Sequence, residues 1–275
     1  MLLQAIATLS AAFSLFWCVS AGDWLWRLPL GFVLFFLGQT FLVFFITWIL
    51  TLFIDLNKEQ EQDSRFFRWL TCELIGLLIP FLNVRIHIQG MEKVPLDRRF
   101  LLVCNHLHNF DPPLLLHFFE IYQLAFISKR ENSSMFLVGK LMHKLLAQLI
   151  NRENDREALK TIIKCIQILK DDKASIAVFP EGYTSRDHKF HGFRPGVFKI
   201  AMKAQVPIVV CTITNTHKVL SNLKKLKRTD IALHVVDVIQ PESFAGETTV
   251  TLGNRIHALM ANDLGPEYAP DETKE

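Results

Sequence analysis

The sequence predicts an α/β fold with a mostly parallel central sheet flanked by helices, preceded by an N-terminal hydrophobic helical hairpin. Short apolar runs typical of strands alternate with longer segments of helical periodicity, as in a layered α/β domain. Before that alternation come two stretches without a charged side chain, residues 1–22 and 28–54. Each exceeds the roughly 20 residues with which a helix crosses the hydrocarbon layer of a membrane.

The composition is uneven along the chain. Half of the 275 residues are apolar and the mean hydropathy is +0.24, which is high for a soluble protein, yet 21% are charged. This length fits one substantial domain with a small accessory segment. We divide the chain into two hydrophobic membrane helices over 1–56, an amphipathic interfacial helix over 57–83, a folded domain over 84–264 and a disordered tail over 265–275.

The two apolar stretches predict a hairpin of membrane helices. The linker over 20–29 carries Trp24 and Trp26, whose rings prefer the headgroup level of a bilayer. Three cationic side chains follow the second stretch, at Lys58, Arg65 and Arg68. This positive charge predicts that the larger C-terminal part, and with it both termini, lies on the cytoplasmic side. A cleaved signal peptide is not expected, because residues 1–9 carry no basic side chain. A hairpin that enters one leaflet without crossing it is the alternative.

The rest of the chain alternates between strand and helix patterns. Residues 63–82 mix charged and apolar side chains as an interfacial helix does, and Pro80 ends the pattern. Strands are predicted over 84–89, 100–104, 124–128, 175–179, 208–213 and 231–236. Helices are predicted over 111–122, 135–148, 155–170, 196–205 and 248–264. The tail from Gly265 is rich in proline and acidic residues and is predicted to be disordered.

Cysteine and charge patterns narrow the function classes. The five cysteines form no C-x-x-C pair and do not cluster with histidine, so neither a disulfide framework nor a metal site is predicted.

The net charge is only +3, but the segment 217–228 concentrates five cationic side chains. It is either a solvated helix end or a surface attracted to anionic lipid or an acidic carrier protein. A nucleic-acid partner is not expected, because no aromatic residue interleaves these cations.

Two polar clusters follow predicted strands, where open α/β sheets place their ligands. In the first, over 105–112, Asp111 lies five positions after His106. Its carboxylate can accept one ring N–H, which leaves the other nitrogen free as a base for an attacking hydroxyl. A structural loop histidine is the simpler alternative, and His108 is a second candidate for the base.

The second cluster is Phe-Pro-Glu-Gly-Tyr-Thr-Ser over 179–185, followed by Arg186, Lys189 and Arg194. A carboxylate, a glycine that permits close backbone approach and nearby cations suit a polar or phosphorylated substrate. An ordinary Pro-Glu-Gly turn is the alternative.

Together and in this order, the clusters resemble the signature of the glycerolipid acyltransferase family that includes the 1-acylglycerol-3-phosphate acyltransferases. In that family the HX4D pattern is the first motif and Phe-Pro-Glu-Gly the third. The second motif resembles Lys129, Glu131 and Arg152 here, and the fourth resembles residues 206–209. The resemblance covers roughly residues 84–239 and implies a glycerolphosphate acyltransferase-like fold.

The resemblance also implies roles for single residues. His106 is the expected base and Asp111 its orienting partner. Glu181 and Gly182 are expected to help bind the acceptor, and Lys129 and Arg152 its phosphate. Thr184 stands where the third motif usually has a phosphate-binding arginine, so Arg186 or Arg194 is hypothesised to compensate.

The function that the resemblance implies is transfer of a fatty acyl group from acyl-CoA or acyl-carrier protein to the free hydroxyl of lysophosphatidate, forming phosphatidate in phospholipid biosynthesis. The partners are then membrane lipid and the acyl donor, with no further cofactor and no covalent acyl-enzyme, and the catalytic domain lies on the cytoplasmic side of the cell membrane. Two alternatives stay open: acylation of another lysolipid, and an inactive membrane lipid-binding relative. A hydrolase is not favoured, because no Gly-x-Ser-x-Gly elbow is present.

Overall fold

The sheet of the folded domain orders its strands so that distant segments become neighbours. The computed structural model describes residues 1–21, 26–151 and 153–270. Within them, seven strands pair in the order β1-β7-β6-β2-β5-β3-β4. Their bounds are β1 Val84–Gln89, β2 Leu101–Cys104, β3 Leu124–Lys129, β4 Gln148–Ile150, β5 Ser175–Val178, β6 Ile208–Ile213 and β7 Thr229–Ile239. Every pairing is parallel except that of β6 with β7, which confirms the predicted mostly parallel sheet.

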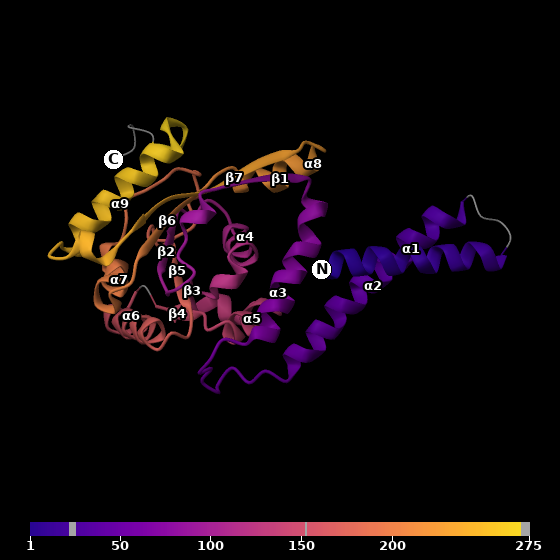
Figure 1. Cartoon of the computed structure of the whole chain (residues 1–275), viewed down its shortest axis with the longest axis horizontal. Helices are drawn as coiled ribbons and strands as arrows, with labels where there is room; N and C mark the ends of the chain where they lie inside the picture. Colours follow the sequence, from indigo (N-terminus) through magenta and orange to yellow (C-terminus); the bar gives the residue numbers. More distant parts are fainter. Residues whose placement is uncertain (22–25, 152, 271–275) are drawn as a thin grey trace.

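Helices cover both faces of this sheet (Figure 1). One face packs against α6 (Asp155–Lys170), α7 (Lys199–Ala204) and α9 (Thr249–Leu264), and the other against α4 (Asp111–Phe118) and α8 (Val219–Lys224). Strand β2 shows why both layers are needed: Leu101 and Val103 belong to the first core, Leu102 and Cys104 to the second, and each is at most 1% exposed. An apolar run without alternation is what a strand buried on both faces requires.

The N-terminal helices α1 (Leu2–Ala21) and α2 (Arg27–Leu52) form a hairpin that extends away from the domain (Figure 1). Both are long and apolar enough to cross a membrane, and their most apolar windows are only 22% and 6% buried. Gly31 lets the two helices approach closely, because a Cβ there would lie 2.9 Å from the Trp17 ring. Residues 22–25 of the predicted linker, with Trp24, lie outside the described residues.

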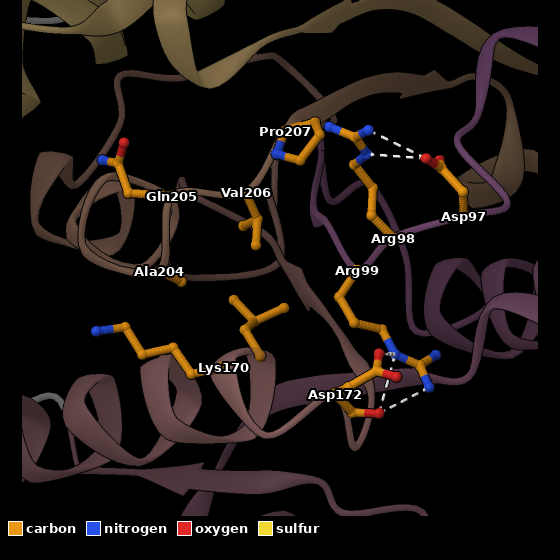
Figure 2. A pocket seen from close by; sticks show the side chains of 10 residues that line it. Asp97, Arg98, Arg99, Lys170, Asp172, Ala204, Gln205, Val206 and Pro207 are labelled. Atoms are coloured by element: carbon orange, nitrogen blue, oxygen red, sulfur yellow. Dashed lines mark hydrogen bonds and ion pairs between the residues drawn. The ribbon is translucent and has the colours of Figure 1, made fainter.

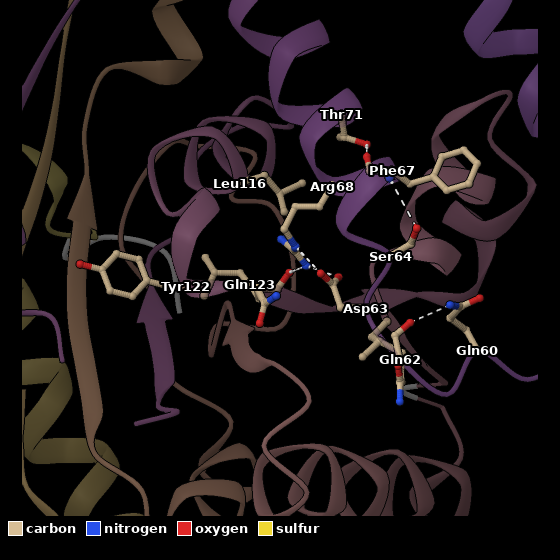
Figure 3. A network of polar contacts seen from close by, with 12 residues as sticks. Gln60, Gln62, Asp63, Ser64, Phe67, Arg68, Thr71, Leu116, Tyr122 and Gln123 are labelled. Atoms are coloured by element: carbon tan, nitrogen blue, oxygen red, sulfur yellow. Dashed lines mark hydrogen bonds and ion pairs between the residues drawn. The ribbon is translucent and has the colours of Figure 1, made fainter. Parts of the chain in front are cut away.

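Helix α3 (Arg65–Leu78) joins the hairpin to the domain. The amino group of Met1 lies 3.1 Å from Oε2 of Glu73 on α3, so the chain begins on the domain side of the hairpin. At the other attachment, Arg68 forms two hydrogen bonds to Asp63, of 2.8 and 2.6 Å (Figure 3). A third, of 3.0 Å, goes to the carbonyl oxygen of Leu124, the first residue of β3. A buried ion pair thus ties α3 to the sheet.

Two predicted segments need correction. The single helix predicted over 135–148 is α5 (Val138–Lys144) followed by the edge strand β4, because Leu146 takes a left-handed backbone (φ 59°) and ends the helical path. The tail predicted to be disordered from Gly265 instead forms a short 3-10 helix, Pro266–Tyr268, whose Tyr268 is 3% exposed. Residues 271–275 of that tail lie outside the described residues.

Candidate active site

The candidate site lies where three neighbouring parallel strands end. In the sheet order β6-β2-β5, the carboxyl ends of these strands meet at one edge. The loop after β2 carries His106, the loop after β5 carries residues 179–194, and the loop after β6 carries residues 214–218. Side chains from three distant parts of the chain therefore converge at this edge, as is usual for ligand sites of open α/β sheets.

His106 and Asp111 form the predicted pair. Nδ1 of His106 lies 2.9 Å from Oδ2 of Asp111, and that oxygen also accepts the backbone N–H groups of Leu107 and His108, both at 2.8 Å. Asp111 is fully buried at the start of α4, where the helix dipole favours a carboxylate. The carboxylate accepts the Nδ1–H, which leaves Nε2 with a free lone pair.

The imidazole is also held from its face and from its backbone. Its ring stacks on Phe179 with centroids 4.1 Å apart and planes at 17°. The backbone N–H of His106 donates to Oε1 of Glu181 (2.8 Å), and its carbonyl oxygen accepts the N–H of Ser185 (3.0 Å). The Asn105 side chain pairs with both backbone groups of Ile213 at the end of β6. The base is therefore fixed by contacts to both flanking loops.

Glu181 acts in the structure as a brace between two loops. It is 1% exposed, and its second oxygen accepts the N–H of His191 (3.1 Å). Burial raises the pKa of Glu181 to about 7 and outweighs the two N–H bonds, which favour the carboxylate. These contacts place Glu181 beneath the His106 loop, and the contact with the acceptor that the motif implies stays a prediction.

Thr184 is a member of the site that sequence reasoning missed. Its Oγ1 lies 2.9 Å from Nε2 of His106. Because Nδ1–H donates to Asp111, this hydroxyl donates to Nε2, the nitrogen that a general base would use. Thr184 therefore shows that a hydroxyl group fits at this nitrogen. The motif comparison flagged Thr184 only as a missing arginine, and no local signal relates it to a histidine 78 residues earlier.

The His108 ring does not form the corresponding pair. Asp111 accepts its backbone N–H, while its ring stacks on Phe110 with centroids 5.2 Å apart. Nδ1 of His108 accepts the N–H of Phe110 at 3.3 Å, and burial lowers the pKa of the ring. The geometry favours His106 over His108 as the base.

The other predicted binding residues are distributed around the site. Gly182 has φ 83°, and a Cβ there would lie 2.8 Å from Nε of Arg194, so only glycine fits this turn. Both residues line a groove of about 320 Å³ whose walls include Ile127, Leu159 and Phe179. Lys129 ends β3 at the same edge of the sheet, and both Lys129 and Arg186 are exposed. Arg152 lies outside the described residues.

A larger pocket of about 510 Å³ lies at the opposite edge of the sheet (Figure 2). Its lining comes from segments that precede β2, β5 and β6. Two of its cations are paired, Arg98 with Asp97 at 3.0 Å and Arg99 with Asp172 at 2.7 Å. It contains none of the residues around His106, so we assign the chemistry to the carboxyl edge.

Comparisons with known proteins show which proteins this chain resembles. The Acyltransferase family model matches residues 85–214, a range that contains the His106, Asp111 and Glu181 cluster. A 1-acyl-sn-glycerol-3-phosphate acyltransferase of Chlamydomonas reinhardtii is 29% identical over 68% of this chain and 58% of its own length. A probable enzyme of the same name from Mycoplasma pneumoniae is 30% identical over 64% of this chain and 66% of its own length. The chain therefore spans less than two thirds of these relatives.

A bacterial relative and a solved structure extend the similarity. The 1-acyl-sn-glycerol-3-phosphate acyltransferase of Salmonella typhimurium is 26% identical over 70% of this chain and 77% of its own length. The crystal structure of the 1-acyl-sn-glycerophosphate acyltransferase PlsC from Thermotoga maritima superposes with a TM-score of 0.61 at 21% identity. The superposition covers 87% of this chain and 95% of the Thermotoga maritima chain, so the two folds are alike.

Proposed function

We propose that this chain, which is similar to 1-acylglycerol-3-phosphate acyltransferases, transfers a fatty acyl group to the free hydroxyl of lysophosphatidate. The product is phosphatidate, and the donor is acyl-CoA or acyl-carrier protein. The observation that carries the proposal is the His106–Asp111 pair, in which Nε2 of His106 accepts a hydrogen bond from a hydroxyl, that of Thr184.

The proposed reaction begins when the acceptor hydroxyl replaces that of Thr184 at Nε2 of His106. As its oxygen attacks the thioester carbonyl, Nε2 takes the proton, which a hydroxyl must lose to become an effective nucleophile. Asp111 holds the Nδ1–H and stabilises the imidazolium. The C–S bond then breaks, and the proton on Nε2 passes to the leaving thiolate. The ester and a free thiol are the products.

The surroundings of the dyad support lipid substrates. The groove beside Phe179 is walled largely by aliphatic side chains and reaches the residue on which His106 stacks, a setting that suits an acyl chain. The apolar hairpin α1–α2 would hold the domain at the membrane, where acceptor and product reside. We propose that the catalytic domain lies on the cytoplasmic side, because cations follow the second helix.

A second acceptor class has one observation in its favour. The motif position that usually holds a phosphate-binding arginine is Thr184, and its hydroxyl is engaged with His106. Another lysolipid, with a headgroup less dependent on an arginine, would fit the same dyad.

The test is a lipid mass-spectrometric assay on the purified full-length chain in detergent. It offers lysophosphatidate and a panel of other lysolipids with either donor. We expect phosphatidate from the wild type and a loss of about 10²- to 10⁴-fold in His106→Ala. His87→Ala is the matched control, because His87 lies exposed on β1 and its ring pairs with the exposed Asp230. If a different lysolipid is acylated, that lysolipid becomes the proposed acceptor. If nothing is acylated with either donor, the proposed activity is refuted.

A further inference from the structure

Two histidines outside the His106–Asp111 pair contact each other near the end of β2. The rings of His188 and His217 stack with centroids 4.3 Å apart and planes at 15°. His188 belongs to the loop after β5 and His217 to the loop after β6, and these strands flank β2 on either side. The stacked pair therefore bridges the loop that begins with His106.

Several polar atoms of this stacked pair and its neighbour Thr216 form no hydrogen bond among the described residues. Nδ1 of His188, Nδ1 of His217 and Oγ1 of Thr216 are sealed from solvent and have no hydrogen-bond partner among the described residues. A buried N–H without an acceptor is costly, so each neutral ring keeps its proton on Nε2. Nε2 is then the donor through which either ring can bind a ligand.

The geometry of the bridge is enforced by the C-terminal segment. The carbonyl oxygen of Tyr268 accepts the N–H of Phe190 (2.7 Å), and its hydroxyl oxygen accepts the N–H of Asn215 (3.1 Å). One residue thus ties together the two loops that carry the rings. His188 also has a left-handed backbone, φ 60°, which a residue other than glycine adopts at some cost. Such strain persists where surrounding contacts over-determine it and is common at ligand sites.

Burial keeps the His217 ring uncharged beside His106. Burial, and next the neighbouring His188, lower the pKa of His217 to about 4, and Asp111 and His108 are among its other electrostatic neighbours. At neutral pH His217 is therefore an uncharged donor close to the dyad. It can bind an anionic group without placing a second positive charge beside the imidazolium that forms on His106.

We propose that His188 and His217 bind phosphate oxygens of the acceptor through their Nε2–H groups and so determine its headgroup. This assignment rests on the proposed function, and it gives the headgroup a binding site in a chain whose third motif offers Thr184 in place of arginine. Thr216, which precedes His217 in the chain, is fully buried.

The test separates hydrogen bonding from ring stacking. His217→Phe keeps a flat ring and removes the donor, whereas His217→Gln removes the ring and keeps an amide N–H near the place of Nε2. We expect the Phe variant to raise KM for lysophosphatidate about tenfold with kcat within about twofold. The Gln variant should stay within about threefold of wild type in KM, and acylation of an uncharged monoacylglycerol should not change in either. His188→Phe and His188→Gln form a second matched pair.

One pattern of results would overturn the proposed headgroup site. If the Phe variants keep the wild-type KM while the Gln variants lose activity, the pair only packs the loops and the proposal fails. Calorimetric binding of glycerol 3-phosphate to the full chain in detergent tests the same point without turnover. Loss of binding in the Phe variants alone supports the headgroup site even if the wild type acylates another lysolipid, and equal binding by all variants overturns it. His87→Phe serves as the surface control.

Discussion

Two carboxylates in this molecule are each paired with a nitrogen side chain five residues away, and they do different work. Asp111 pairs with His106 at the carboxyl edge of the sheet, and Asp63 pairs with Arg68 at the start of α3. Both carboxylate side chains are buried, Asp111 at 0% and Asp63 at 3% exposed. Spacing and burial therefore do not distinguish a chemical pair from a structural one.

The two pairs differ in the nitrogen side chain and in what that side chain contacts besides the carboxylate. Arg68 is 4% exposed, does not lose its proton in proteins, and directs its remaining hydrogen bond to the backbone of β3. His106 is 13% exposed, and its second nitrogen meets a hydroxyl that a substrate can replace. A buried carboxylate supports catalysis when its partner can exchange a proton at an accessible atom. When the partner cannot, the pair fastens two elements together.

The largest expected effect comes from Asp111→Asn. The amide leaves the ring without its anionic acceptor, favours the wrong tautomer and no longer stabilises the imidazolium. We expect kcat/KM to fall about 10³- to 10⁴-fold. Circular dichroism of the same preparation is the control for folding. A loss of less than about tenfold would show that Asp111 does not orient the base.

Arg68→Met should act on stability and not on chemistry. It leaves the Asp63 carboxylate buried and unpaired, which costs about 3–5 kcal/mol and lowers the midpoint of thermal unfolding in detergent by about 10 °C. The double variant Asp63→Leu/Arg68→Met should recover most of that loss, because a well-packed apolar pair can replace a buried ion pair. No double variant of His106 and Asp111 should recover activity. Failure of the double variant to recover stability would mean that the pair itself is required.

Glu181→Gln tests a third buried carboxylate through pH. The folded-state pKa of about 7 lies above the ordinary 4.5, so the folded state holds more protons between these values. Wild-type stability therefore carries a contribution that is present at low pH and is lost as pH rises from about 5 to 7. The variant should lose this part of the slope, about 1–3 kcal/mol across the window. The free energy of unfolding in urea is measured for both proteins at each pH. The same pH dependence in wild type and variant would contradict the raised pKa of Glu181.

The smallest effect is expected for Thr184→Val. Valine keeps the shape and removes the hydroxyl that competes for Nε2 of His106, so kcat should stay within about threefold and KM should not rise. The intact mass of the wild type, incubated with acyl-CoA and no acceptor, should be unchanged. A loss above about a hundredfold, together with an acyl group on Thr184, would instead make this residue a nucleophile.

The sequence by itself determined the features that are local along the chain. The alternation of strand and helix patterns predicted the α/β class, two uncharged stretches predicted the apolar hairpin, and the five-residue step from His106 to Asp111 spans a single loop. Such spacings stay short in any fold, so they can be read without knowing which strands become neighbours.

Only the tertiary structure decided the rest. Thr184, His188 and His217 reach the His106 loop because the sheet places β5 and β6 on either side of β2, and sequence spacing does not specify that order. Tyr268 became ordered for the same reason, since its partners Phe190 and Asn215 lie more than fifty residues earlier in the chain. Hydrogen bonds form only within about 3 Å, and the packing of both cores against the sheet brings these distant groups within that distance.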